Sequence, residues 1–183
     1  MTVLLLLALL ALAVVALLLF NRLVRLRNQV RTAWADIDVQ LQRRHDLVPQ
    51  LVAAVRGYAG HESALLEAVT ALRSRALALQ GPKQLGEIED ALEQGVGRLL
   101  ALREAYPDLK ASANFMQLHQ ELVEVEEHLQ YARRFYNGAV RDYNTAIERV
   151  PDVLVARGFG FGDAEFFQAG ADQRAAIKVE LPR

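Results

Sequence analysis

The chain has 183 residues, with 21 Lys and Arg against 22 Asp and Glu, 52% hydrophobic residues and no cysteine. This length suits one domain plus a targeting segment. The net charge of −1 argues against a nucleic-acid-binding protein, which needs a surplus of basic side chains on one face. Without cysteine there can be no disulfide, thiolate metal site or cysteine nucleophile. Alanine and leucine dominate while glycine and proline are few, so the composition favours helices.

Residues 3–20, VLLLLALLALAVVALLLF, contain no charged or polar side chain. At about 1.5 Å per residue this run matches a hydrocarbon core of about 30 Å, which predicts a transmembrane helix. A cleaved signal peptide is the alternative, but the run lacks a preceding basic stretch and a terminal small-x-small site.

Four arginines follow the span at once: Arg22, Arg25, Arg27 and Arg31. Basic residues normally stay on the cytoplasmic side, so the amino terminus is expected outside and residues 21–183 in the cytoplasm. The same arginines either attract anionic headgroups at the membrane surface or serve only as topology signals.

Apolar residues then recur at helical spacing in four segments. The first begins at Leu23, runs through Ile37 and resumes from Val48 to Tyr58. Later segments cover residues 61–79, 85–102 and 115–147, with breaks at Gly81-Pro82 and Tyr106-Pro107. Gly95 and Gly97 each cost the third helix about 1 kcal/mol of helix propensity relative to alanine.

These segments predict an all-α protein, with a transmembrane helix over residues 3–20, an antiparallel up-down-up-down four-helix bundle with coiled-coil packing over 21–157, and an aromatic and polar tail over 158–183. In that topology Trp34 lies near Ala139. The region of His45 lies near residues 124–128, which offers glutamates of the fourth helix to Arg43 and Arg44.

No enzyme motif accompanies this architecture. None of the four histidines has a glutamate three residues before it, as carboxylate-bridged metal sites in bundles require. His61-Glu62 resembles the start of a zinc motif, but Leu65 replaces the second histidine. Glu124 and His128, one turn apart, are an ordinary polar pair. We therefore expect no metal, no cofactor and no catalysis.

Three segments resemble the LemA family of bacterial membrane-anchored proteins: AWADIDVQLQRRHDLVPQLVAAVRGYAGHE (33–62), YPDLKASANF (106–115) and ARRFYNGAVRDYNTAIERVP (132–151). The resemblance implies one amino-terminal membrane helix, a cytoplasmic four-helix bundle and no established enzymatic activity. The family's tail often ends in a Pro-Tyr-Phe-Glu-like cluster. Here Glu165-Phe166-Phe167-Gln168 stands in that place, which puts any role of that cluster in doubt.

Two sets of side chains are candidates for a partner surface. Asparagines repeat at seven-residue spacing on the first and fourth helices, at Asn21, Asn28, Asn137 and Asn144. They form either a binding stripe or a solvated, helix-pairing stripe. The tail phenylalanines Phe159, Phe161, Phe166 and Phe167 either contact the membrane or a partner, or cover the open end of the bundle.

The stretch QLQRRHDLVPQLV places Arg43, Arg44, His45 and Asp46 in the first helix, just before Pro49. Pro49 has no N–H for the carbonyl of His45, so that carbonyl needs another donor and the helix should kink. Arg44 or His45 also occupies an apolar position of the seam, where a buried charge needs a partner. We interpret the stretch as a polar joint that fixes register, with a ligand or partner site as the alternative.

The sequence thus favours a membrane-anchored scaffold or adaptor that presents a protein-binding surface at the inner face of the bacterial cytoplasmic membrane. The expected partners are the lipid bilayer and a membrane or envelope protein, and the sequence leaves a homo-oligomer open. An accessory or regulatory subunit of a membrane protease or envelope-stress system is the alternative.

Overall fold

The computed structural model describes residues 1–79 and 81–167. Within these residues the chain forms helices and connecting turns without any strand, which confirms the predicted all-α class. The elements are α1 (Thr2–Arg56), α2 (Ser63–Ala78), α3 (Pro82–Ala101), the 3-10 turn η1 (Leu102–Glu104), α4 (Pro107–Ala111), α5 (Ala113–Glu148) and α6 (Asp152–Phe159). The sequence did not predict η1, α4 or α6. The predicted tail beyond Phe167 lies outside the described residues.

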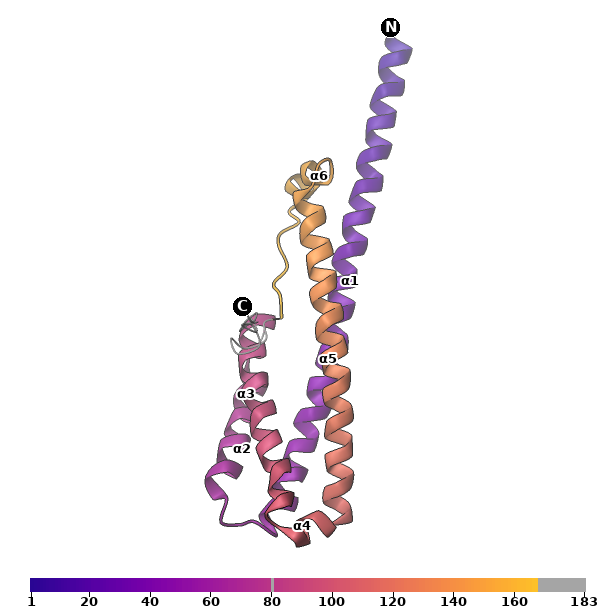
Figure 1. Ribbon diagram of the computed structural model, residues 1–183. Coiled ribbons are helices and arrows are strands. Elements are labelled where there is room, and N and C mark those ends of the chain that lie inside the picture. The colour runs from indigo at the N-terminus through magenta and orange to yellow at the C-terminus, as the bar shows by residue number, and fades with distance from the viewer. Residues whose placement is uncertain (80, 168–183) are drawn as a thin grey trace, which may run out of the picture. The chain divides into compact units, whose positions relative to one another are not determined.

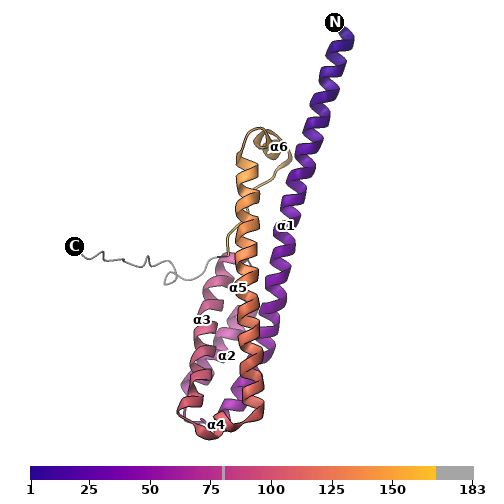
Figure 2. The same cartoon turned by 45° about the vertical axis from the view of Figure 1, so that its right-hand side comes forward.

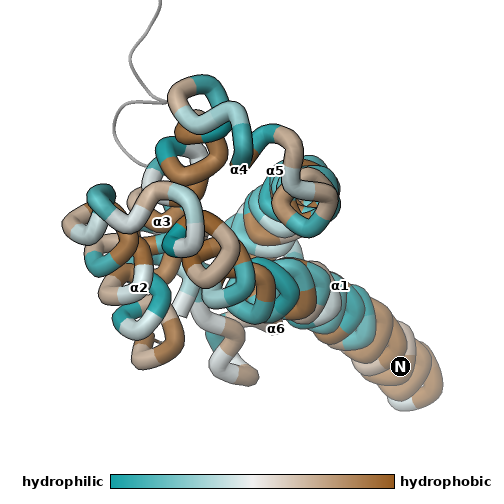
Figure 3. The backbone as a smooth tube through the Cα atoms, turned by 90° about the horizontal axis from the view of Figure 1, so that it is seen from below, coloured by the Kyte–Doolittle hydropathy of each residue, from teal (hydrophilic) through white to brown (hydrophobic). Residues whose placement is uncertain are grey.

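Helix α1 is long and apolar enough at its amino-terminal end to cross a membrane. Its first turns are hydrophobic on all sides (Figure 3), and their leucines and valines are exposed. They project beyond α6 with no other described element beside them (Figure 1). The same helix then continues as far as Arg56 with Pro49 inside it, so the predicted continuity between the apolar span and the first amphipathic helix is confirmed.

The described chain divides into two compact units. The first consists of residues 1–41 and 128–166, that is, most of α1, the carboxyl-terminal half of α5, and α6. Its core contains the predicted apolar rows, including Leu23 and Ile37 of α1 and Tyr143 of α5. The Trp34 ring lies 5.4 Å from the Tyr136 ring, one turn from the predicted neighbour Ala139. Trp34 therefore lies within one helical turn of the position predicted for it along α5.

The second unit consists of residues 42–127 together with Phe167. It contains the last turns of α1, all of α2, α3, η1 and α4, and the first turns of α5. Helices α2 and α3 lie side by side in both views (Figures 1 and 2). Its core contains part of the predicted rows, including Val69 of α2 and Leu92 of α3, whereas the predicted Leu65, Leu72, Leu79, Ile88 and Leu102 are only partly buried. Tyr58, which the pattern placed on the seam, is 47% exposed because α1 has already ended at Arg56.

A glycine allows α2 and α3 to approach each other closely. A Cβ atom added to Gly95 would lie 2.8 Å from Val69 Cγ2, a contact that real Cβ atoms essentially never make. A Cβ atom added to Gly97, two residues later, would have no neighbouring atom within 4 Å. The two glycines look equivalent in the sequence, and only Gly95 is required by packing.

Candidate functional site

Two residues of the polar stretch before Pro49 are buried, and they form the centre of an ion-pair cluster within the second unit. Arg44 is 3% exposed and donates from Nη1 to Oε2 of Glu89 at 3.2 Å. Glu89 comes from α3 and is completely buried. His45 Nε2 lies 2.6 Å from the other carboxylate oxygen, Oε1 of Glu89. One buried carboxylate thus satisfies two neighbouring basic side chains of α1, which provides the partner that a buried charge needs.

The glutamates of α5 also take part, as the sequence predicted. Arg44 donates to Glu126, and Glu93 of α3 lies 3.8 Å from the same guanidinium nitrogen. Arg43 donates to Glu124 at 3.1 Å in a solvent-exposed pair. Arg44 therefore connects α1 with both α3 and α5. Glu89 and Glu93 were missed, although an acidic residue on the apolar face of a helix was a usable signal for Glu89.

The carbonyl group that Pro49 leaves without a donor is satisfied from α2. Arg73 donates from Nε to the His45 oxygen at 2.6 Å. The Gln50 side chain donates to the next carbonyl oxygen, that of Asp46, at 3.1 Å. The predicted need for another donor is therefore confirmed, and the donor is a side chain 28 residues away in sequence. Asp46 and Pro49 themselves are exposed.

No group of three or more potential metal ligands occurs in the part of the chain that the structure describes. One of the four histidines, His119, has a pKa that is lowered by partial burial and then by the positive charge of Arg103. The two side chains lie 3.1 Å apart, with Arg103 Nη1 facing His119 Nε2. This contact favours the neutral imidazole, which accepts from the guanidinium.

The arginines after the apolar span have different surroundings. Arg22 donates from Nη1 to both carboxylate oxygens of Asp152 at 2.8 Å, and Asp152 is 1% exposed. Arg27 lies over the Phe161 ring, 4.9 Å from its centroid. Arg25 and Arg31 are exposed. Two of the four predicted membrane-surface residues thus also hold the carboxyl-terminal segment of the first unit.

The predicted asparagine stripe is divided in the same way. Asn144 donates from Nδ2 to the Ala164 carbonyl and accepts from the Ala164 N–H, both at 2.9 Å. Asn21 and Asn28 are exposed, and Asn137 is half-buried. Asn144 therefore binds the backbone of the extended segment after α6, while the two asparagines of α1 remain on the surface.

Two tyrosines of α5 bind the same extended segment. Tyr143 donates to the Gly162 carbonyl at 2.9 Å and Tyr136 to the Glu165 carbonyl at 2.8 Å. Burial, followed by the negative charge of Glu165, raises the pKa of Tyr136 to about 12. Burial is also the main reason that the pKa of Tyr143 is raised, while nearby charges act in both directions. Neutral tyrosines are thus the stable donors that hold this segment.

The tail phenylalanines separate into covered and exposed members. Phe161 and Phe167 are buried, whereas Phe159 is 67% and Phe166 43% exposed. The interpretation that the tail phenylalanines cover the folded part of the chain applies to Phe161 and Phe167. Phe159 and Phe166 keep enough free surface to contact something else.

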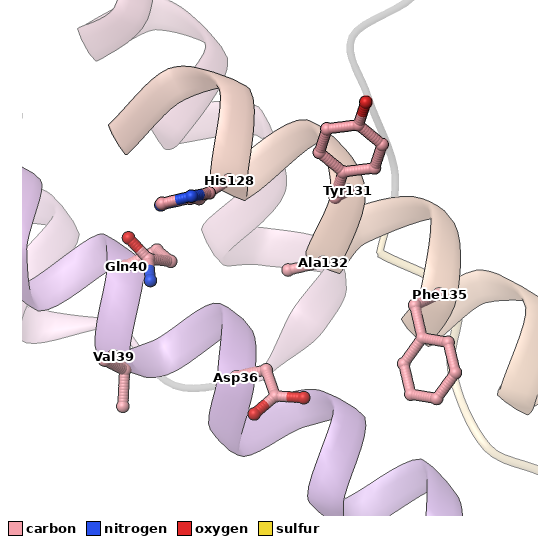
Figure 4. A pocket seen from close by; sticks show the side chains of 7 residues that line it. All are labelled: Asp36, Val39, Gln40, His128, Tyr131, Ala132 and Phe135. Carbon is pink, nitrogen blue, oxygen red and sulfur yellow. The ribbon is translucent and has the colours of Figure 1, made fainter. Parts of the chain in front are cut away.

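A groove that the sequence did not reveal lies between α1 and α5 in the first unit (Figure 4). Its volume is about 410 Å³, and its lining residues are Asp36, Val39, Gln40, His128, Tyr131, Ala132 and Phe135. The side chains of Val39, Tyr131 and Phe135 are 62%, 67% and 51% exposed, although each is apolar or aromatic. In the sequence they lie beside the buried rows and look like ordinary edge positions of amphipathic helices.

The groove also contains an unused hydrogen-bond acceptor. Gln40 Oε1 is buried and has no hydrogen-bond partner. A buried acceptor without a donor costs about 1–3 kcal/mol. The groove therefore combines aromatic walls with the Gln40 amide, whose oxygen lies on the side of His128 (Figure 4).

The sequence of this chain matches a known protein family. Residues 33–181 match the LemA family. Protein LemA of Metamycoplasma hominis is 26% identical over 86% of this chain and 72% of its own length. Magnetosome protein MamQ 2 of Paramagnetospirillum magneticum is 24% identical over 81% of this chain and 64% of its own. Magnetosome protein MamQ of Magnetospirillum gryphiswaldense is 23% identical over 88% and 69%.

The chain spans about two thirds of the length of these magnetosome relatives. The family match covers the polar joint, the groove and the segment that the α5 tyrosines bind. On this match, the chain belongs to the LemA family.

Proposed function

We propose that this protein is a membrane-anchored scaffold or adaptor without catalysis of its own, in which an antiparallel four-helix bundle presents a protein-binding surface at the inner face of the bacterial cytoplasmic membrane. The observation that carries the proposal is the groove of Val39, Tyr131 and Phe135, whose large apolar side chains are more than half exposed. Exposed aromatic clusters with a polar rim are characteristic of protein-binding sites.

The chemistry of the groove defines the partner. Tyr131 and Phe135 offer aromatic faces for an apolar side chain. Asp36, also in the lining, favours a basic side chain. We therefore expect a partner segment that inserts an apolar residue next to a lysine or an arginine.

The anchor fixes the height of this surface above the membrane. Val39 follows Phe20, the last residue of the apolar run, by 19 residues of the uninterrupted helix α1. At about 1.5 Å per residue the groove lies roughly 28 Å from the end of the span. A partner that is itself a membrane or envelope protein, with a domain reaching this height, fits that position.

A photo-crosslinking experiment in cells tests the proposal. A photoreactive amino acid at Tyr131 should give a defined crosslinked product, and the same amino acid at Leu77 should not. Leu77 is the matched control, since it is 57% exposed on α2 and does not line the groove. The substitution Phe135→Ser should reduce the yield at Tyr131. Equal products at both positions would contradict a specific groove. A membrane protease or stress sensor as the crosslinked partner would favour the accessory-subunit alternative.

Topology is tested with single cysteines, because the natural chain contains none. A Val39→Cys variant should resist a membrane-impermeant maleimide in intact cells and react after the membrane is permeabilised. Reaction in intact cells would place residues 21–183 on the outer side and overturn the proposed orientation.

A further inference from the structure

Helix α6 is held at the end of the apolar span. The ring of Phe20, the last residue of the apolar run, lies 4.9 Å from the Phe159 ring and 5.6 Å from the Phe161 ring. At the start of α6, the buried Asp152 accepts both hydrogen bonds from Arg22. Both ends of α6 are therefore fixed to α1 at residues 20–22.

The free surface of this region includes three large apolar side chains as well as the exposed Arg149 and Arg157. Val150, Leu154 and Phe159 are 74%, 73% and 67% exposed. A soluble protein would normally cover such side chains, since their exposure to water is unfavourable. Here they lie at the level of Phe20, where a helix that crosses the membrane leaves the hydrocarbon core.

A basic groove adjoins this region between α1 and α5. It has a volume of about 340 Å³ and is lined by Arg22, Leu26, Arg141, Asp142, Thr145, Ala146 and Arg149. Arg22 and Leu26 follow Phe20 by two and six residues, which corresponds to about 3 and 9 Å along α1. The headgroup layer of a bilayer is about 5–8 Å thick, so the end of the groove at Arg22 lies at headgroup depth.

The charges of the groove favour an anion. Its lining includes three arginines and one carboxylate, that of Asp142, which lies 3.6 Å from Arg141. Arg22 is already paired with Asp152, whereas Arg141 remains 72% exposed. One guanidinium group can donate two parallel hydrogen bonds to a phosphate group, so Arg141 and Arg149 are both suited to bind a phosphate diester in the groove.

We propose that this region is a second membrane contact, in which Val150, Leu154 and Phe159 enter the bilayer interface and the groove of Arg22, Arg141 and Arg149 binds the headgroup of an anionic phospholipid. The inference rests on the proposed role of α1 as a membrane anchor. It differs from the topology signal of Arg25 and Arg31, because two arginines of the groove, Arg141 and Arg149, lie near the carboxyl-terminal end of α5. The contact would fix the first unit against the membrane surface.

Fluorescence quenching measures the depth of α6. The full chain, carrying a single cysteine labelled with an environment-sensitive dye, is reconstituted into vesicles that contain lipids spin-labelled near the headgroup. The label at Leu154→Cys should be quenched strongly. The label at Val39→Cys should not be quenched, since Val39 is similarly exposed but lies roughly 28 Å along α1 from Phe20, the end of the apolar run.

A third label separates the two ways in which the experiment can fail. A label at Leu10→Cys, within the apolar run, reports insertion of α1 through lipids that are spin-labelled along the acyl chain. If Leu10 is quenched and Leu154 behaves like Val39, the second contact is wrong and the anchor stands. If Leu10 is not quenched, the anchor itself fails and the inference fails with it.

Lipid retention measures the headgroup site. The full chain is extracted from nanodiscs of mixed phosphatidylcholine and phosphatidylglycerol, and its bound lipids are counted by native mass spectrometry. The preference for phosphatidylglycerol should fall about five-fold for each of Arg141→Gln and Arg149→Gln. The matched control Arg134→Gln removes the same charge from the exposed side of α5 outside the groove, and it should leave the preference unchanged.

Two results would overturn the lipid site. One is an unchanged preference in the Arg141→Gln, Arg149→Gln double variant. The other is binding of inorganic phosphate to the detergent-solubilised chain with no preference between the two lipids, which would identify a free-anion site. Arg141→Lys with Arg149→Lys should restore most of the preference, and this recovery excludes misfolding as the cause of the loss.

Discussion

Arg73 donates a hydrogen bond to the His45 carbonyl, to which Pro49 cannot donate. We expect the contribution of this bond to stability to depend on the proline. Pro49→Ala restores the N–H that normally donates to the carbonyl four residues earlier. Arg73→Met removes the donor that replaces it, at a donor–acceptor distance of 2.6 Å. The cost of Arg73→Met should therefore depend on which residue occupies position 49.

The size of the effect follows from burial and charge. His45 is 6% exposed, so its carbonyl has little water to replace a lost donor. A hydrogen bond from a charged group contributes about 1.5–3 kcal/mol. Arg73 is only part-buried, so about 1–2 kcal/mol is expected in the natural background, which has Pro49. For a chain of this length that corresponds to a fall in Tm of about 2–8 °C. In the Pro49→Ala background, less than half of this cost should remain.

The four proteins of this double-mutant cycle can be compared by thermal unfolding of the full chain in mild detergent, followed by circular dichroism. Arg75→Met provides the matched control, because Arg75 is an exposed arginine on the same helix, and its cost should stay within about 0.5 kcal/mol. Equal costs for Arg73→Met in the two backgrounds would refute the reasoning. Arg73 would then stabilise α2 by packing and not by replacing the bond that proline removes.

Three further predictions concern stability. Glu89→Gln should destabilise the chain by about 3 kcal/mol in urea unfolding, because it neutralises the buried carboxylate that Arg44 and His45 share. Glu124→Gln, in an exposed pair, should cost less than about 1 kcal/mol, and similar costs for the two variants would contradict the buried cluster. Gly95→Ala should lower the Tm, because the clash with α2 costs about 1–3 kcal/mol of stability. Gly97→Ala should raise the Tm, because alanine stabilises α3 by up to about 1 kcal/mol. A shift of the Tm in the same direction for both would show that packing does not distinguish them. Tyr136 has a pKa of about 12 in the fold and 10.0 in an unfolded chain, so its contribution to the free energy of unfolding is complete below pH 10 and is lost as the pH rises toward 12. Tyr136→Phe should therefore reduce the loss of stability at alkaline pH. An unchanged dependence of the free energy of unfolding on pH would contradict this prediction.

Local rules in the sequence predicted much of the architecture. Apolar spacing predicted the long helices because burial of one helical face needs only the 3.6-residue period. The length of the apolar run predicted the candidate span. The lack of an N–H at Pro49 predicted an unsatisfied carbonyl, since that follows from covalent structure alone. The short elements α4 and α6 were missed because each is stabilised by its contacts and not by a long periodic pattern.

The sequence predicted those features of the candidate site that can be inferred from a single helix. The sequence indicated that Arg43 and Arg44 needed acidic partners, and the glutamates of α5 supply two of them. It did not identify Glu89, because choosing among acidic residues requires the rotation of α3 about its axis. The groove was missed for a related reason: Val39 and Phe135 become neighbours only when α1 and α5 pack together.

The sequence by itself determined the long helices, the apolar candidate span and the polar groups that needed partners, because each follows from covalent structure or from the period of one helix. Only the tertiary structure decided which partner each group found. It selected Arg73 for the His45 carbonyl, Glu89 for Arg44, and Gly95 over Gly97 as the glycine required by packing. The physical reason is the same in each case. Such choices depend on distances of a few ångströms between segments far apart in the chain, and no local pattern of residues encodes those distances.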